Sequence, residues 1–195
     1  MQAHVDDHWV QRSRIEGWRS RAVYKLLEIN QQVKLFRAGM RVADLGASPG
    51  GWSQYAVKQI QPHGKLLAVD QIEMQYLPGV DFIQGGLADQ LVQEKIKQYL
   101  HGGCFDLVLS DMAPNLTGIS ATDQSRMLHL VELALDFCER FLSTGGDMLI
   151  KTFHGGDFNQ ARKVINNSFS KVSIKKPRAS RDHSSECYIL ALSKL

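Results

Sequence analysis

The chain has 195 residues, of which 44% are hydrophobic and 22% charged, and its formal net charge is +3. This length fits one domain with a full core, and the composition is ordinary for a globular protein. No apolar run approaches the roughly 20 residues that a membrane-spanning helix needs, and residues 1–10 lack the basic and apolar regions of a signal peptide, so we expect a cytoplasmic protein without membrane association.

The predicted elements start with a basic N-terminal segment and helix, residues 1–30, which we expect to form part of the same domain as residues 31–195. Residues 1–19 show no clear periodicity and are expected to be loosely structured or helical. Residues 20–31 predict a helix with Ser20 as its N-cap. Beyond them, strands are predicted at 40–46, 65–70, 80–84, 105–111, 147–153, 171–176 and 186–193, and helices at 51–60, 87–99, 122–142 and 157–169.

This alternation of strands and helices predicts an α/β fold with a doubly wound, seven-stranded, mostly parallel sheet. The helix at 122–142 is apolar over much of its surface and is expected to pack flat on the sheet. Because no helix separates the last two strands, the final strand is expected to run antiparallel, at or near an edge. Ligands of such sheets bind beyond the carboxyl ends of the strands, near the point where the strand order reverses.

A glycine-rich turn, DLGASPGGW at residues 44–52, follows the first predicted strand and opens a helix. Gly46, Gly50 and Gly51 permit tight turning and close approach of a ligand to the backbone. Asp70 ends the next strand, where a carboxylate can accept hydrogen bonds from ribose hydroxyls. The turn therefore predicts a cofactor that contains a nucleoside.

The same turn discriminates between nucleoside cofactors. It has neither the GKS or GKT of a nucleotide triphosphatase nor a GxGxxG frame, and Pro49 offers no N–H to a pyrophosphate. Asp44 precedes the first glycine by two residues and is placed to face a positive charge. S-adenosyl-L-methionine carries an ammonium and a sulfonium and no phosphate, so it suits this turn better than a dinucleotide does. A glycine turn that only connects strand and helix is the alternative.

Two lysines and two acids lie in four separate short signatures, which are RSRAVYKL with Lys25, LSDMAPN with Asp111, LIKTF with Lys151 and SSECYIL with Glu186. Asp111 and Lys151 end predicted parallel strands, and an antiparallel last strand brings Glu186 to the same edge. The helix that carries Lys25 is expected to cover that edge. Such a set assists the ionisation of a hydroxyl whose pKa lies far above neutrality, and it predicts methyl transfer to a ribose hydroxyl.

Lys151 is the expected centre of this set, either as the base or as the group that orients the hydroxyl and stabilises the developing oxyanion. Lys25 and the sulfonium favour its neutral form by like-charge repulsion, whereas the two carboxylates favour its charged form. Both roles stay open on the sequence. Taken singly, each of the four residues also has a non-catalytic interpretation, as a solvated lysine, an edge-strand charge or a turn residue.

Two basic segments stand out on the almost neutral chain, at residues 12–41 and 171–181. They predict a polyanion, RNA, bound to one face, and a solvated surface is the alternative. Trp9, Trp18 and Tyr24 interleave with the first segment, where they either stack on unpaired bases or pack in the core. The expected RNA-binding residues are Arg12, Arg14, Arg19, Arg21, Lys175, Lys176 and Arg178.

The cysteines and histidines give no strong signal. Cys104, Cys138 and Cys187 form no CxxC pair and are predicted to be buried free thiols. His4 and His8 have a spacing that suits a metal on a helix. No further cluster of ligands accompanies these two histidines, so no metal site is predicted.

The chain resembles the RrmJ/FtsJ family of ribosomal RNA 2′-O-methyltransferases from about Trp9 to Leu192. The resemblance is carried by GWRSRAVYKLLEI, LFRAGMRVADLGASPGGWSQY, GVDFIQG, LVLSDMAPNLTG, LVELALDFCERFL, LIKTF and SSECYILAL. It implies a Rossmann-like S-adenosylmethionine-dependent methyltransferase fold. It also implies a catalytic tetrad of Lys25, Asp111, Lys151 and Glu186, and cofactor contacts from Gly50, Trp52, Asp70 and Asp111.

The resemblance further implies the substrate, a uridine ribose of ribosomal RNA in an assembled or assembling large subunit. One departure concerns the cofactor site. After GVDFIQG the family usually has an aspartate that contacts the adenine edge, and Gly86 stands there instead. Asp89, a backbone group or a water are the candidate substitutes. We therefore expect weaker cofactor binding and an active protein.

Three alternatives stay open beside a methyltransferase of this kind. The first is a non-catalytic RNA-binding factor in ribosome assembly, which the complete tetrad disfavours. The second is a 2′-O-methyltransferase for another RNA, such as transfer RNA or a messenger RNA cap. The third is a nicotinamide-dependent oxidoreductase, which the missing GxGxxG frame disfavours. The sequence carries no clear oligomerisation signal, so a monomer is expected.

Overall fold

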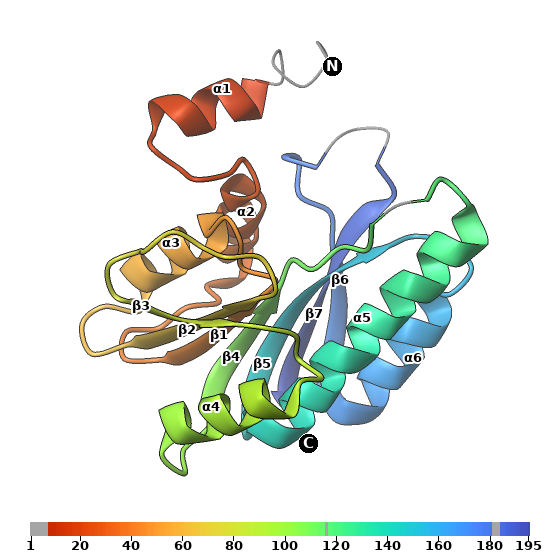
Figure 1. Ribbon diagram of the computed structural model, residues 1–195. Helices are drawn as coiled ribbons and strands as arrows, with labels where there is room; N and C mark the ends of the chain where they lie inside the picture. The colour runs from red at the N-terminus through yellow and green to blue at the C-terminus, as the bar shows by residue number, and fades with distance from the viewer. Residues whose placement is uncertain (1–7, 116, 181–183) are drawn as a thin grey trace.

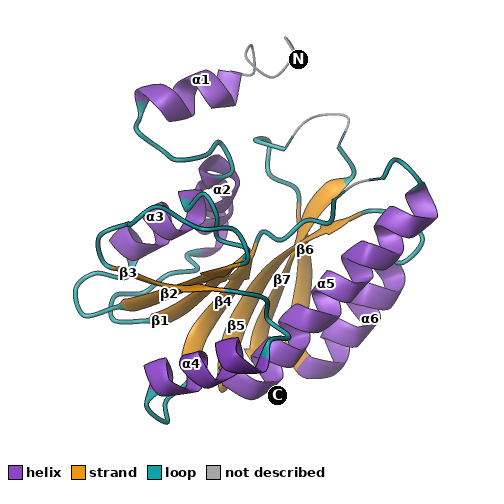
Figure 2. Cartoon of the chain, in the orientation of Figure 1, coloured by secondary structure: helices purple, strands orange, loops and turns teal. Residues whose placement is uncertain are grey.

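The computed structural model describes residues 8–115, 117–180 and 184–195. Residues 1–7, with His4 and most of the N-terminal stretch that lacks signal-peptide features, lie outside the described residues, as does Arg181 of the second basic segment. Within the described residues, a seven-stranded sheet carries helices on both faces (Figure 1, Figure 2). The prediction of an α/β fold is therefore confirmed.

The strands are β1 (Arg41–Leu45), β2 (Lys65–Asp70), β3 (Val80–Gln84), β4 (Phe105–Ser110), β5 (Leu142–Phe153), β6 (Phe169–Lys175) and β7 (Glu186–Lys194). The helices are α1 (His8–Ile15), α2 (Val23–Val33), α3 (Gly51–Gln59), α4 (Gln90–Leu100), α5 (Ser120–Phe141) and α6 (Phe158–Ser168). Each predicted strand and helix is present, and the N-terminal segment is helical at α1. In the described part of the chain, no helix combines the length and the apolar composition that crossing a membrane needs.

The strand order is β3-β2-β1-β4-β5-β7-β6. Strands β1 to β5 run parallel to their neighbours among themselves, whereas β7 is antiparallel to both β5 and β6. The last strand is therefore antiparallel, as predicted, and lies one place in from the edge strand β6. The order reverses between β1 and β4, which is the position where doubly wound sheets bind their ligands.

The central strands are near-continuous apolar runs because helices cover both of their faces. Val42, Ala43 and Leu45 of β1 have no exposed surface. Helices α4, α5 and α6 contribute to the core on one face, and α2 and α3 to the core on the other (Figure 1). In α5, Val131 and Phe137 are buried in the first of these cores, as expected of a helix that packs flat on the sheet.

Two local predictions are wrong. The N-cap of α2 is Ala22 without a side-chain cap, and Ser20 instead accepts the N–H of Val23 with its backbone carbonyl at 3.4 Å. The side chain of Ser20 lies against the glycine turn, so packing outweighs the capping preference. Cys104 is exposed in the turn after α4, whereas Cys138 and Cys187 are buried free thiols as predicted.

Candidate active site

The four lysine and acid residues predicted from the sequence meet at the carboxyl edge of the central strands. Asp111 directly follows β4, and Lys151 lies on the neighbouring strand β5. Glu186 opens the antiparallel strand β7, which places it at the same edge, opposite Phe153 of β5. Lys25 lies on α2, which packs over this face of the sheet. We call Lys25, Asp111, Lys151 and Glu186 the tetrad.

The tetrad consists of two lysine–carboxylate pairs. Nζ of Lys25 lies 2.7 Å from the carboxylate of Glu186. Nζ of Lys151 lies 3.1 Å from Oδ1 of Asp111 and donates to the backbone carbonyl of the same residue at 2.5 Å. The side chain of Lys151 is only 8% exposed, and those of Lys25 and Glu186 are 12% exposed. Because water screens these pairs little, they interact more strongly than surface ion pairs do.

Tyr188 joins the two pairs, and it was not among the predicted site residues. Its hydroxyl donates to Oδ1 of Asp111 at 2.8 Å and lies 3.5 Å from Oε1 of Glu186. The ring is fully buried and packs on Trp52 with 5.6 Å between the ring centroids. Its sequence signal is the position two residues after Glu186, which puts both side chains on one face of β7.

The surroundings of Glu186 and Tyr188 set the charge states of these two side chains. Burial raises the pKa of the Glu186 carboxyl, but the charge and hydrogen bond of Lys25 and a hydrogen bond from Ser180 hold that pKa below its ordinary value. The Ser180 hydroxyl donates to Oε1 of Glu186 at 2.8 Å. Burial and the charge of Asp111 raise the pKa of Tyr188 well above its ordinary value. At neutral pH the site therefore holds a carboxylate at Glu186 and a neutral phenol at Tyr188.

A cavity of about 360 Å³ opens beside the tetrad. Gly46, Asp70 and Asp111 line it from the ends of β1, β2 and β4. The remaining lining residues are Ser48, Val69, Gln71, Ile72, Gly85, Gly86, Leu87, Met112, Ala113, Asn115, Leu130 and Leu133. Since Asp111 also pairs with Lys151, it connects the cavity to the tetrad.

The charge of the cavity matches a cationic ligand. Two carboxylates and, among the described residues, no lysine or arginine line it. Two positions before Gly46, Asp44 is fully buried; Oδ2 accepts a hydrogen bond from Ser53 at 2.6 Å, and Oδ1 has no hydrogen-bond partner. Burial raises the pKa of Asp44 to about 7, with a further contribution from the charges of Asp111 and Asp70. The two lining carboxylates, Asp70 and Asp111, fit the ammonium and sulfonium of S-adenosyl-L-methionine and disfavour a pyrophosphate, whereas Asp44 is not part of the lining.

Asp70 organises the loops on both sides of the cavity. Its Oδ2 accepts the N–H of Ser48, and its Oδ1 accepts the N–H of Ile72, both at 2.8 Å. The acid that was predicted to contact a ribose thus also ties the glycine turn to the loop that follows β2.

Three residues assigned to the cofactor do not line the cavity. Gly50 has a φ of 102°, and a Cβ at this position would lie 2.9 Å from Nη1 of Arg19. Gly51 approaches Ser20 in a similar way. The indole N–H of Trp52 donates to a backbone carbonyl just before α2 at 2.8 Å. The two glycines therefore permit the N-terminal segment to pack closely on the turn, and their role toward the cofactor stays a prediction.

The predicted RNA-binding residues divide into two groups. Arg19, Arg21 and Lys176 donate to backbone carbonyls of the chain itself, and so they hold the segments around the site. The other four are exposed or half-buried on the surface, namely Arg12, Arg14, Lys175 and Arg178. RNA contact by either group stays a prediction.

The aromatic residues of the N-terminal segment pack internally. Trp9 and Tyr24 lie with their ring centroids 4.9 Å apart, and Trp18 meets the edge of Tyr55 at 6.2 Å. The Tyr24 hydroxyl and the Trp18 indole both donate to Glu16, each at 2.9 Å. Of the two roles left open by the sequence, these contacts favour packing.

Gly86 lines the cavity at the position where the family resemblance implies an aspartate. Asp89 is not part of this lining; its Oδ1 accepts the N–H of Leu91 at 2.8 Å and caps α4. The carboxylate of Asp89 is therefore committed to the helix terminus.

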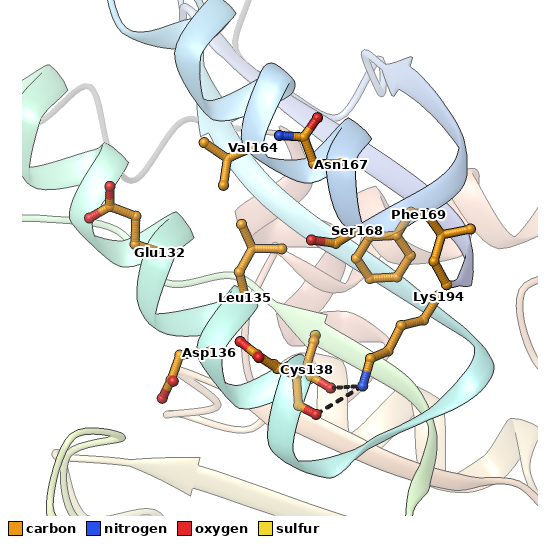
Figure 3. Close-up of a pocket in the computed structure, with 11 residues that line it drawn as sticks. Glu132, Leu135, Asp136, Cys138, Val164, Asn167, Ser168, Phe169 and Lys194 are labelled. Atoms are coloured by element: carbon orange, nitrogen blue, oxygen red, sulfur yellow. Dashed lines mark hydrogen bonds between the residues drawn. The ribbon is translucent and has the colours of Figure 1, made fainter.

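Another cavity, of about 460 Å³, lies between α5, α6 and the end of β7 (Figure 3). It contains no member of the tetrad. Lys194 extends along it and donates to the carbonyls of Cys138 and Glu139 at 2.7 and 2.9 Å, which ties the end of β7 to the last turn of α5. Lysines stabilise helix C-termini in this way, so the contacts have a structural explanation.

Comparison with known proteins identifies the family. Residues 18–194 match the FtsJ-like methyltransferase family. Two similar relatives are proteins named ribosomal RNA large subunit methyltransferase E. The one from Nitrosomonas eutropha is 48% identical over 100% of this chain and 95% of its own length, and the one from Legionella pneumophila is 49% identical over 98% and 93%.

Solved structures agree with the fold. A ribosomal RNA methyltransferase of Plasmodium falciparum superposes with a TM-score of 0.81 at 28% identity, over 91% of this chain and 99% of that one. The fibrillarin of Aeropyrum pernix, solved with S-adenosyl-L-methionine, superposes with a TM-score of 0.59 at 16% identity, over 89% and 75%. The latter supports the Rossmann-like fold alone.

Proposed function

This chain belongs to the FtsJ-like methyltransferase family, and from this premise we propose that it methylates the 2′-hydroxyl of a ribose, that of a uridine, in large-subunit ribosomal RNA. The cofactor is S-adenosyl-L-methionine, as the glycine turn predicts and as membership of a methyltransferase family requires. The proposal depends mainly on Asp111, which takes part in two sites. It lines the cavity that matches a cationic ligand, and its carboxylate pairs with Lys151 at 3.1 Å. A ribose hydroxyl that lies beside this cavity would therefore lie next to the tetrad.

S-adenosyl-L-methionine supplies, when bound, a methyl group that its sulfonium activates for transfer. The chain has to hold it and to prepare the acceptor oxygen. Asp70 and Asp111 are the cavity residues proposed to hold its polar groups. Gly46 lets Met112 pack closely on the glycine turn at the edge of the cavity, since a Cβ there would lie 2.5 Å from the Met112 side chain. The carboxylates favour the positively charged cofactor over its neutral, demethylated product.

Lys151 is the residue proposed to act on the acceptor. Its Nζ lies 3.1 Å from the carboxylate of Asp111 and donates to the backbone carbonyl of the same residue. An ammonium donates to the 2′-oxygen and stabilises the negative charge that develops as the hydroxyl loses its proton. Of the two roles open on the sequence, this contact supports the electrostatic one.

Lys25, Glu186 and Tyr188 are proposed to position this centre. The ion pair of Lys25 with Glu186 adds a second cation beside the acceptor and fixes α2 on the sheet. Tyr188 donates to Asp111 and so fixes the carboxylate that Lys151 faces. Preorganised charges of this kind need no rearrangement during the reaction, which is the main source of their catalytic effect.

The substrate assignment rests on the relatives and on charge. Relatives that match almost the whole of this chain are named for methylation of the large ribosomal subunit. The exposed arginines of α1 supply positive charge on the N-terminal segment that covers the glycine turn. Membership of the family excludes the nicotinamide-dependent oxidoreductase. The main remaining alternative is a 2′-O-methyltransferase that acts on another RNA.

The test is methyl transfer from radiolabelled S-adenosyl-L-methionine to large ribosomal subunits that lack ribose methylation. We expect label in ribosomal RNA that survives alkaline hydrolysis within a dinucleotide, because a 2′-O-methyl group blocks cleavage of the adjacent phosphodiester. Label that is released as mononucleotides would contradict the ribose assignment. Label found only when transfer RNA is offered would contradict the substrate.

A further inference from the structure

Tyr76 is the only aromatic side chain of the described chain that is largely exposed, with 82% of its surface accessible. It lies in the loop between β2 and β3. The other aromatic side chains are buried or half-buried in packing contacts. An exposed tyrosine leaves about 100 Å² or more of apolar ring surface in water, and this surface contributes no hydrophobic free energy to folding. The ring is therefore available for contact with a partner.

The backbone that carries Tyr76 is held firmly. The guanidinium of Arg19 donates to the carbonyl of Tyr76 at 2.6 Å and to that of Gln75 at 2.8 Å. It also donates to the carbonyl of Pro49 in the glycine turn at 3.2 Å. Met74 is buried beneath the loop. The ring of Tyr76 is therefore exposed on a backbone that two hydrogen bonds of Arg19 fix, and the third hydrogen bond links Arg19 to the glycine turn.

The same loop borders the cofactor cavity. Gln71 and Ile72 line that cavity, and the side chain of Ile72 is 68% exposed. The N–H of Ile72 is fixed by Asp70, and the carbonyl of Glu73 accepts from the hydroxyl of Ser48 at 3.3 Å. Two exposed apolar side chains thus stand on an ordered loop between the cavity and the N-terminal basic segment.

An unpaired base is the partner that this arrangement fits. Bases stack on aromatic side chains, and neighbouring cations take the phosphates. The N-terminal aromatics are committed to internal packing, so the stacking role is not filled by them. Arg12 and Arg14 stay exposed on α1, a few residues before the arginine that binds the Tyr76 loop. Arg12 is paired with Glu16 at 2.6 Å, so Arg14 is the arginine of α1 that we expect to contact a phosphate of the bound strand.

We infer that Tyr76 stacks on an unpaired base of the RNA substrate next to the target nucleotide, with Ile72 as the apolar neighbour on the cavity side. This inference rests on the proposed function and adds a positioning contact to it. Stacking holds the strand so that one ribose lies at the mouth of the cavity. It is independent of base identity, because every base offers a flat apolar face.

The test compares Tyr76→Ala, Tyr76→Phe and Tyr76→Trp with the wild type. Binding to protein-free large-subunit ribosomal RNA is measured over a range of salt concentrations, and methyl transfer to undermethylated subunits gives KM and kcat. We expect Tyr76→Ala to weaken RNA binding and to raise KM by about 5- to 100-fold, the usual range for loss of one stacked base. The Phe and Trp variants should match the wild type. The salt dependence should keep its slope, since no ionic contact is lost.

Leu91→Ala is the matched control, because Leu91 is a 72% exposed apolar residue of α4 that does not line the cavity. It should leave all values unchanged. Unchanged RNA affinity of Tyr76→Ala would overturn the inference. An equal loss of cofactor affinity would also overturn it, because it would show that Tyr76 mainly stabilises the loop beside the cofactor. A weaker interaction with subunits but not with free RNA would overturn it as well, because it would indicate that Tyr76 contacts a ribosomal protein. Absence of methyl transfer by the wild type would instead overturn the proposed function, and RNA binding would still decide the inference.

Discussion

Gly86→Asp should tighten the binding of S-adenosyl-L-methionine. Gly86 lines the cavity, and its backbone is not in the left-handed region, so a side chain is tolerated there. A Cβ at this position would have Nε2 of Gln71 at 3.2 Å as its nearest neighbour, and this is the mobile end of an exposed side chain. The family resemblance implies that an aspartate here accepts a hydrogen bond from the adenine edge. One such hydrogen bond contributes about 1 kcal/mol, or about fivefold in affinity.

Titration calorimetry with purified protein measures this change. Gly86→Ala is the matched control, because it introduces the contact with Gln71 without an acceptor, and it should bind as the wild type does. Gly86→Asn keeps an acceptor but removes the charge and should fall between Ala and Asp. The reasoning about this position is refuted if Gly86→Asp binds no more tightly than Gly86→Ala while both variants melt at the wild-type temperature.

Three further predictions follow from the charges of the site. Because the folded pKa of Glu186 is lowered from 4.5, its stabilising contribution is present above that pH and is lost as the pH falls through the lowered value; melting temperatures of Glu186→Gln should therefore depend less on pH in acid than those of the wild type. The pKa of Asp44 is raised from 3.8 to about 7, so cofactor-free protein should lose stability as the pH rises over that range, by about 1.4 kcal/mol for each unit in which only the unfolded chain is ionised. Asp44→Asn should flatten this decline in urea titrations, and an unaltered decline would show that another group causes it. Arg14→Gln should weaken RNA binding and reduce the slope of log affinity against log salt by about 0.7–0.9, whereas Arg19→Gln, which loses three bonds to carbonyls, should mainly lower the melting temperature and the affinity for cofactor. Equal salt slopes for Arg14→Gln and the wild type would remove α1 from the RNA interface.

The fold was accessible from the sequence because its signals are local and periodic. The apolar runs of β1, β2 and β4 are typical of strands buried on both faces, and the absence of a helix before β7 predicts its direction. The tetrad was accessible because Asp111 and Lys151 follow or end strands whose carboxyl ends must meet. Patterns of this kind involve residues close together in the sequence, and the sheet topology then determines where those residues lie.

Contacts between distant segments were not accessible in the same way. The sequence predicts Arg19 to be an RNA-binding cation within a basic segment. In the structure its guanidinium donates to the carbonyls of Gln75 and Tyr76, more than 50 residues away. Gly50 and Gly51 are predicted to contact the cofactor, and the sequence did not indicate that their missing side chains also make room for the N-terminal segment. Tyr188 was overlooked because its role depends on its contact with Asp111, a carboxylate that follows a different strand, β4. Each of these roles depends on a contact between residues far apart in the chain, and local sequence patterns do not show which distant groups lie within hydrogen-bonding distance.

The central claim is that Lys151 acts on the acceptor oxygen. The most direct test is single-turnover methyl transfer to undermethylated large subunits by Lys151→Ala, with Lys97→Ala as the control, since Lys97 is a 57% exposed lysine of α4. Cofactor affinity, RNA affinity and melting temperature are measured for each variant. We predict that Lys151→Ala lowers the rate by about 100-fold or more while both affinities stay within a few-fold of wild type, and that Lys97→Ala is unchanged. A Lys151→Ala rate within a few-fold of wild type, in a protein that folds and binds both ligands, would contradict the account.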